Sequence, residues 1–238
     1  MTQEPLLAPD VEPRPDAAAA LFGARLPLAD RFVEHLATTA VERGLVGPRE
    51  VPRLWSRHVL NCAVLQELIG ADQRVVDVGS GAGLPGVTLA VARPDLRLVL
   101  VEPLERRVAW LQMVVDDLGL DVEVCRARAE EVVGTVRAPV VTARAVAPLE
   151  RLAAWGLPLL EAGGTLLAIK GRSAAAELEA ASAALARLGA VEQGIVECGS
   201  GLLEVPTTVV SVRVGDRVPR GPDRRDGGSR RRRRKGQR

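Results

Sequence analysis

Residues 75–86 read V-V-D-V-G-S-G-A-G-L-P-G. An apolar, β-branched run leads into Asp77, glycines follow at positions 79, 81 and 83, and Pro85 stands where a helix can begin. Glycine lets the backbone turn sharply and lie close to a ligand, and a helix N-terminus presents N–H groups to an anionic group. The stretch therefore predicts a strand, a tight ligand-binding turn and a helix.

Strand-like and helix-like segments alternate on the carboxyl-terminal side of this loop. Short apolar runs predict strands at 74–78, 96–101, 122–125, 140–143, 165–169, 190–197 and 207–214. Helical patterns lie between the first six of these runs, at 85–92, 104–118, 129–133, 149–160 and 173–188. This alternation forces parallel pairing, and the last two runs suggest a hairpin. We predict an α/β, Rossmann-like fold with a doubly wound, mostly parallel seven-stranded sheet and helices on both faces.

The remaining sequence fits a single domain. Hydrophobic residues make up 47% of the chain but aromatic residues only 2%, and a Val/Leu/Ala core suits parallel strands covered on both faces. We expect one domain at 21–214, with a helical part (21–70, helices at 28–43 and 53–69) and a Rossmann-like core (71–214). Residues 1–20 are expected to be a disordered segment, and residues 215–238 a basic disordered tail.

The charge is unevenly distributed along the chain. The net charge is +2, yet residues 217–238 hold 11 basic and 2 acidic side chains, which leaves the rest of the chain at about −7. The tail can add sequence-independent affinity for RNA, or it can be a solvated extension; both interpretations stay open. Three widely spaced cysteines predict reduced thiols and no metal site. Without a signal peptide or a long apolar run, we expect a soluble cytoplasmic protein with no membrane partner.

The glycine loop allows more than one ligand. Residues 81–86 match G-x-G-x-x-G, the dinucleotide fingerprint, and Glu102 lies 21 residues past Gly81, where an acid can bind an adenosine ribose. Asp77 favours S-adenosylmethionine, because a carboxylate there repels a pyrophosphate and suits the cationic amino acid end of S-adenosylmethionine, directly or through water. A tight turn without a ligand, and a solvated loop acid at Glu102, are the alternatives.

The same residues resemble a known family, ribosomal small subunit methyltransferase G, also called glucose-inhibited division protein B. The resemblance covers about residues 53–214. Besides the glycine loop, it rests on Arg57-His58, on Glu102 with the following E-R-R-V-A-W-L, on A-R-A at 143–145, and on Lys170-Gly171. The chain departs from the family before Arg57, where G-L-V-G-P-R-E-V-P replaces an Asn-Leu-Thr segment that many members carry, and the arginine tail is not general to the family.

The resemblance implies the Rossmann-like fold of class I methyltransferases and methyl transfer from S-adenosylmethionine to guanine N7 in 16S ribosomal RNA of the small ribosomal subunit. Nothing in the sequence demands more than a monomer, and no action on DNA is expected. The cofactor-binding residues predicted on these grounds are Gly79, Gly81, Leu84, Glu102, Ala129, Glu130 and Arg144. The residues predicted to bind RNA are Arg57, His58 and Lys170. Each of four residues can instead have a purely structural role. Glu130 can be an acid favoured in the first turn of a helix, Arg144 and Lys170 can form structural ion pairs, and His58 can be a packed side chain.

Methylation of N7 needs alignment of a lone pair rather than a general base, so no catalytic acid or base is predicted. The alternative enzyme is a small-molecule S-adenosylmethionine-dependent methyltransferase, which usually carries an inserted lid that this chain lacks. An NAD-dependent oxidoreductase and a non-catalytic ribosome-binding module are the remaining hypotheses.

Overall fold

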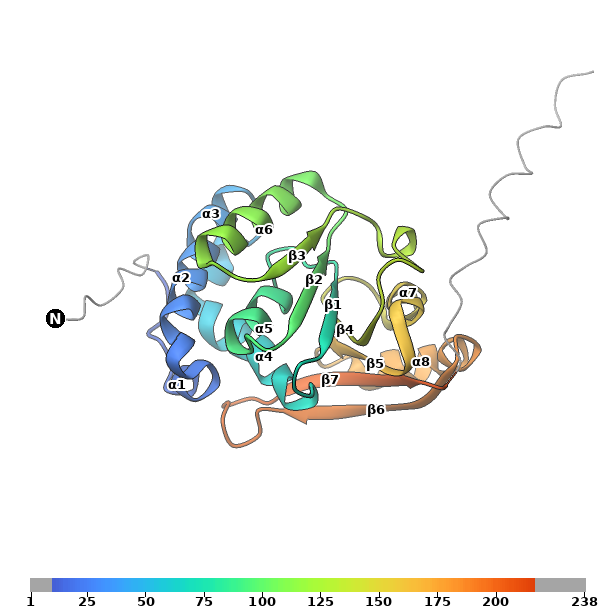
Figure 1. The fold of residues 1–238 in the computed structure, drawn as a ribbon. Coiled ribbons are helices and arrows are strands. Elements are labelled where there is room, and N and C mark those ends of the chain that lie inside the picture. Colours follow the sequence, from blue (N-terminus) through green and yellow to red (C-terminus); the bar gives the residue numbers. More distant parts are fainter. Residues whose placement is uncertain (1–9, 217–238) are drawn as a thin grey trace, which may run out of the picture.

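Seven strands form one sheet in the order β3-β2-β1-β4-β5-β7-β6 (Figure 1). The computed structural model describes residues 10–216. The strands are β1 (Arg74–Val78), β2 (Arg97–Val101), β3 (Val122–Cys125), β4 (Ala138–Arg144), β5 (Leu160–Ile169), β6 (Ala190–Cys198) and β7 (Thr207–Val214). Strand β7 is antiparallel to both neighbours, and the other pairs are parallel. The predicted doubly wound, mostly parallel sheet is confirmed.

Helices cover both faces of the sheet (Figure 1). Helices α5 (Gly86–Ala92) and α6 (Glu105–Leu118) lie with the N-terminal helices on one face, and α7 (Leu149–Gly156) and α8 (Ala174–Arg187) lie on the other. Successive residues of a strand point to opposite faces, so Val76 and Val78 belong to the cluster under α7 and α8, while Val75 packs with Leu89 of α5. Because both faces are covered, β1 reads as a continuous apolar run interrupted only by Asp77.

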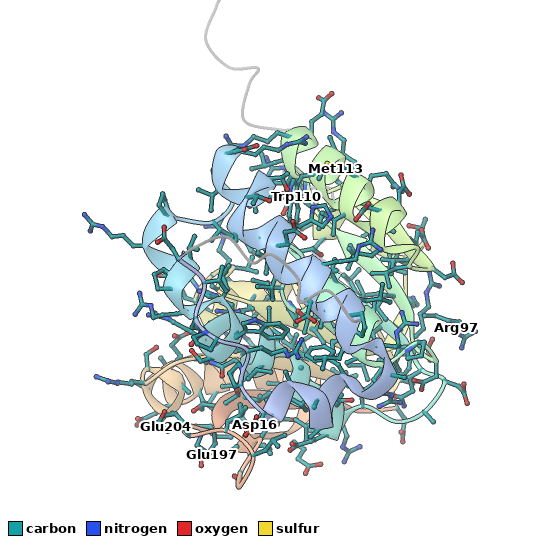
Figure 2. The ribbon with its side chains drawn as sticks, turned by 90° about the vertical axis from the view of Figure 1, so that its left-hand side faces the viewer. Asp16, Arg97, Trp110, Met113, Glu197 and Glu204 are labelled. Carbon is teal, nitrogen blue, oxygen red and sulfur yellow. The ribbon has the colours of Figure 1, made fainter. Side chains whose placement is uncertain are left out.

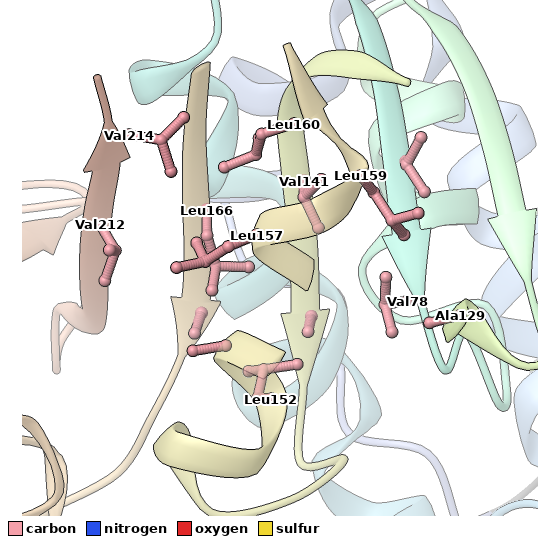
Figure 3. Packing of buried hydrophobic residues seen from close by; sticks show 14 of the residues in the cluster. Val78, Ala129, Val141, Leu152, Leu157, Leu159, Leu160, Leu166, Val212 and Val214 are labelled. Carbon is pink, nitrogen blue, oxygen red and sulfur yellow. The ribbon is translucent and has the colours of Figure 1, made fainter. Parts of the chain in front are cut away.

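The core beneath α7 and α8 is aliphatic (Figure 3). Val78, Val141, Leu166 and Val212 come from four different strands and belong to one buried cluster with Leu152 of α7. Burial of each such side chain contributes roughly 1.5–3 kcal/mol. The low aromatic content of the chain is thus compatible with a well-filled core.

The N-terminal part forms a group of short helices against α5 and α6. They are α1 (Ala17–Phe22), α2 (Leu26–Ala37), α3 (Thr39–Glu42) and α4 (Leu60–Ala63), with 3₁₀ turns η1 (Gly23–Arg25), η2 (Pro48–Arg53) and η4 (Val64–Leu68) and a π-helical turn η3 (Leu54–Val59). In Figure 2, Trp110 and Met113 of α6 lie beside these helices. The indole of Trp110 is fully buried, and its N–H donates to the Thr39 hydroxyl at 2.9 Å.

Several predicted boundaries differ from the structure. The helix expected at 53–69 consists of η3, α4 and η4, because a short apolar pattern indicates a helix without indicating its hydrogen-bond pattern. Strand β5 begins at Leu160, not 165, since a register shift opposite Ala138 lets the glycines at 163 and 164 stay in the strand. The expected disorder at 1–20 does not hold for its described part: Ala18 is fully buried in α1, and Glu12 accepts hydrogen bonds from Ser56.

The basic tail is outside the described residues for all but positions 215 and 216, as are residues 1–9 of the N-terminal segment. Within residues 10–216, no helix is long and apolar enough to cross a membrane.

The strand order reverses between β1 and β4. Chain connections from β1 lead outward through β2 to β3, and connections from β4 lead outward to β5, β7 and β6. In open α/β sheets the crevice at such a reversal, at the carboxyl ends of the strands, is where ligands bind. Here that place follows Val78 of β1 and Arg144 of β4, which end the two strands.

Candidate active site

A cavity of about 850 Å³ opens at the carboxyl ends of β1, β2 and β4. Its wall is formed by the segments that follow these strands, by η5 (Ala129–Glu131) after β3, and by residues of the N-terminal helical part. The volume is in the range of cofactor and substrate sites. Gly79, Gly81, Leu84, Glu102, Ala129, Glu130, Arg144 and His58 all line it, so the structure brings together most of the predicted site residues.

The glycine loop brings its backbone directly to the cavity. Gly79 and Gly81 have φ values of +71° and +55°, a region that side chains with a Cβ rarely adopt. A Cβ on Gly79 would also lie 2.9 Å from a methyl carbon of Val146, across the reversal point. The loop is tied to the neighbouring strand by the Gly79 N–H, which donates to the Val101 carbonyl at 2.8 Å. Glycine is therefore needed at position 79 for both conformation and space.

Glu102 is a carboxylate held rigidly at the end of β2. Only 1% of its surface is exposed, and its two oxygens accept from the backbone N–H groups of Gly81 at 3.1 Å and Leu104 at 3.0 Å. The Arg107 guanidinium lies 3.6 Å away. A carboxylate has about four acceptor sites, so these contacts orient Glu102 and leave capacity for two vicinal hydroxyl groups. This geometry favours a ribose site over a solvated loop acid.

Asp77 has structural contacts that the sequence did not indicate. It is fully buried beneath the loop, and Val78 and Gly79 form the cavity wall above it. Its carboxylate accepts from the Thr142 hydroxyl at 2.9 Å and from the N–H of Gly86, the first residue of α5, at 3.2 Å. Burial raises the pKa of this carboxyl to about 6. Asp77 therefore fixes the loop and the start of α5 from below, rather than facing the amino acid end of a ligand directly.

The segment after β3 presents backbone groups to the cavity. Ala129 and Glu130 are the first two residues of η5, and N–H groups in the first turn of a helix have no acceptor inside that helix. The Glu131 carboxylate accepts from the Arg128 N–H at 2.8 Å and so fixes the start of the turn. These backbone groups are placed to bind a polar ring edge such as that of adenine.

Arg144 is held by the N-terminal helical part. One guanidinium nitrogen donates to the His58 carbonyl and to the Cys62 sulfur, both at 3.2 Å. The other contacts the Arg57 carbonyl at 3.2 Å and the His58 Nδ1 atom at 2.6 Å. His58 in turn contacts the Glu50 carboxylate through Nε2 at 2.8 Å. Arg144 therefore joins β4 to η3 at the cavity wall.

The other two predicted RNA-binding residues differ in accessibility. The Arg57 side chain is 54% exposed, with its Nε 3.8 Å from the Glu50 carboxylate. Lys170 is only 9% exposed, and its ammonium donates to the Ala147 carbonyl at 2.7 Å and the Glu177 carboxylate at 2.8 Å. This hydrogen bond from Lys170 lowers the pKa of Glu177. The structure thus gives Lys170 the contacts of a structural ion pair.

Glu50 and Trp155 are among the cavity residues that the sequence did not indicate. Glu50 lies in η2, eight residues before His58, within the segment that departs from the family pattern, so no motif marked it. Trp155 also lines the cavity, with the Arg151 guanidinium carbon 4.8 Å from its ring centroid. Its only sequence signal is that it is one of three tryptophans in a chain almost without aromatic residues.

Comparisons with known proteins agree with this site. Residues 25–205 match the GidB family model, described as rRNA small subunit methyltransferase G. The ribosomal RNA small subunit methyltransferase G of Paenarthrobacter aurescens is 63% identical over 198 residues, 83% of this chain and 92% of that protein. The protein of the same name from Mycobacterium marinum is 54% identical over 219 residues, 90% of this chain and 94% of that one.

Solved structures agree on the fold alone. A methyltransferase from Pyrococcus furiosus aligns over 64% of this chain and 80% of its own, with a TM-score of 0.50 and 12% identity. A branched-chain polyamine synthase from Thermus thermophilus aligns over 69% of this chain and 59% of its own, with a TM-score of 0.50 and 16% identity. The family match spans most of the sequence and includes the whole cavity wall. The chain belongs to the rRNA small subunit methyltransferase G (GidB) family.

Proposed function

We propose that this protein transfers the methyl group of S-adenosylmethionine to guanine N7 in 16S ribosomal RNA of the small ribosomal subunit. The observation that carries the proposal is the membership of the chain in the methyltransferase G family together with the intact cavity at the reversal point of the sheet. The choice of N7 and of 16S RNA rests on the family resemblance.

The residues at the cavity fit S-adenosylmethionine. Glu102 is aligned by two backbone N–H groups to accept hydrogen bonds from ribose hydroxyls. The backbone of Gly79 and Gly81, together with Leu84, would line the amino acid and sulfonium end, and the backbone of Ala129 and Glu130 would bind the adenine edge. Arg144 forms the opposite wall, where its guanidinium is fixed by η3.

Methyl transfer to guanine N7 depends mainly on how the enzyme positions the two reacting groups. The cofactor supplies an electrophilic methyl group on a sulfonium, and guanine N7 offers an in-plane lone pair without a proton. No general base is required, and proximity and orientation supply most of the rate. In agreement with this, Glu50 and His58 at the cavity wall use their polar atoms in hydrogen bonds within the chain. Their contribution is therefore to shape and orient the site.

RNA approaches from the exposed rim beside η2 and η3. The side chains of Arg53 and Arg57 are 47% and 54% exposed, and arginines there suit phosphate oxygens. His58 is 15% exposed and tied to its neighbours, so we propose that it supports this rim rather than binding a phosphate itself. We likewise propose that Lys170 holds α7 to α8 in place of an RNA contact. We further propose that the enzyme acts as a monomer, and its substrate would place it in the cytoplasm.

The test is transfer of a radiolabelled methyl group to small ribosomal subunits that lack base modifications, followed by identification of the labelled nucleoside. The expected product is 7-methylguanosine. A matched pair of variants controls for the site: Glu102→Ala removes the ribose ligand, and Glu105→Ala removes a 75% exposed carboxylate three residues later. Label on a different nucleoside, or equal loss in both variants, contradicts the proposal.

A further inference from the structure

Three elements meet at one side of the cavity through a chain of hydrogen bonds. Glu50 of η2 accepts from His58 of η3 at 2.8 Å, and His58 contacts Arg144 of β4 at 2.6 Å. All three side chains line the cavity. The glycine loop and Glu102 account for a ribose site without this chain of contacts, so it requires its own explanation.

The chemistry of the two partners fixes the state of the His58 ring. A guanidinium has donors only, so the nitrogen that faces Arg144, Nδ1, must carry a lone pair. The ring proton of a neutral imidazole then lies on Nε2, where it donates to the Glu50 carboxylate. A protonated ring has donors on both sides and cannot accept from Arg144. The contacts therefore select neutral His58 with its proton on Nε2.

We infer that Glu50 and His58 are positioning residues, which hold the Arg144 guanidinium against the cavity wall through the Nε2–H tautomer of His58. The inference rests on the proposed function and adds to it two residues that act through Arg144 without touching the cofactor or the RNA base. Without these contacts, the long side chain of Arg144 could adopt many rotamers. The acceptor on His58, together with the carbonyls of Arg57 and His58, restricts it to one.

Taken together, the groups around His58 disfavour protonation of its ring. Glu50 from η2 favours a charged ring, whereas Arg57 on the same turn and Arg144 on β4 disfavour it, and Cys62 of α4 contributes a buried thiol beside Arg144. Arg53 of η2 also binds Glu50, at 3.0 Å, and partly neutralises its charge. Burial and then the Arg144 charge lower the pKa of His58 below its ordinary 6.5. The tautomer is thus the dominant state near neutral pH, and acid breaks the contact.

The chain offers an internal control, because His35 is its only other histidine. His35 contacts Asp117 on α6, at 2.8 Å, away from the cavity wall. Two-bond ¹H–¹⁵N correlation spectra of the intact protein labelled with ¹⁵N-histidine report tautomer and titration for each ring. We expect His58 to show Nε2–H at pH 7.5 and to titrate below 6.5, with His35→Gln assigning the second set of signals. An Nδ1–H tautomer, or a ring that is protonated at pH 7.5, overturns the inference.

Kinetics test the link to Arg144. Glu50→Ala removes the charged acceptor and is expected to lower kcat/KM for RNA methylation roughly 10-fold or more, the scale of one hydrogen bond to a charged group. Glu50→Gln keeps an acceptor oxygen for Nε2–H and is expected to stay within about threefold of the unchanged protein, a rescue that a loss of charge alone does not predict. Equal losses in Glu50→Ala and Glu50→Gln, or none in either, contradict positioning through the tautomer.

The pH profile separates positioning from general stability. We expect an acid limb of kcat/KM at the pH where the His58 ring titrates in the spectra. His58→Gln presents an acceptor and a donor without titrating, so the limb should disappear, while His35→Gln should retain it. A limb that persists in His58→Gln overturns the inference. If the protein methylates no RNA at all, the proposed function fails, while the ring spectra still decide whether Glu50 and Arg144 fix the tautomer.

Discussion

Asp77→Asn is expected to remove a pH-dependent cost from the folded state. The buried carboxylate of Asp77 sits beneath the glycine loop, and burial raises its pKa from 3.8 to about 6. An acid whose pKa is raised on folding stabilises the fold while it is protonated, and this stability is lost as the pH rises through the folded pKa. At about 1.36 kcal/mol per pH unit, the full loss amounts to roughly 3 kcal/mol above pH 7.

Asparagine suits the same two partners. Its oxygen can accept from the Gly86 N–H, and its amide can donate to the Thr142 hydroxyl, which rotates to accept. The amide does not titrate. Between pH 4.5 and pH 7.5 the unchanged protein should lose about 2 kcal/mol of unfolding free energy relative to Asp77→Asn. The remainder of the roughly 3 kcal/mol is lost below pH 4.5.

The assay is urea unfolding of both proteins at the two pH values, without cofactor. Asp95→Asn is the matched control: its partner Arg93 lowers the pKa of Asp95, so that carboxyl is largely ionised in both states across this window, and its substitution should have nearly the same effect at both pH values. If the difference between Asp77→Asn and the unchanged protein does not change with pH, the carboxylate is not held in a costly buried state and the reasoning fails.

Three further predictions test the site and its support. Gly79→Ala should weaken S-adenosylhomocysteine binding in calorimetry by at least tenfold, because it meets both a positive φ and a valine methyl, whereas Gly81→Ala meets only the backbone strain and should lose less; equal losses would contradict this. Glu102→Gln should weaken the same binding roughly 10- to 100-fold, since one amide N–H then faces a backbone donor; unchanged affinity would exclude Glu102 as the ribose ligand. Lys170→Met should lower the unfolding free energy by about 1–3 kcal/mol by leaving Glu177 without its ammonium, while RNA affinity measured by filter binding stays the same; a selective loss of RNA affinity would restore the predicted RNA contact.

The glycine loop shows which features can be predicted from neighbouring residues in the sequence. Residues 75–86 specify a strand, a glycine turn and a helix because each depends on backbone preferences and on the spacing of apolar residues, which are properties of neighbours in the chain. Glu102 was found for the same reason, since the distance from glycine loop to second strand end is set by one helix and one strand. The parallel pairing of the first five strands follows from the alternation of strands and helices along the chain.

What the side chains do depends on contacts across the fold. The sequence suggests a ligand contact for Asp77. In the fold, its carboxylate accepts hydrogen bonds from Thr142, 65 residues away, and from Gly86 at the start of α5. The sequence suggests an RNA contact for Lys170, yet Glu177, seven residues further on in the first turn of α8, pairs with its ammonium.

The sequence by itself determined the order of elements, the sheet class and the place of the cofactor loop, because these follow from periodicity and from the conformations that glycine and proline allow. The tertiary structure alone decided the contacts among Glu50, His58 and Arg144, which come from three elements and meet only when η2 and η3 pack against the end of β4. The physical reason is that a polar side chain acquires its charge state and orientation from its partners, and 86 residues of chain separate His58 from Arg144.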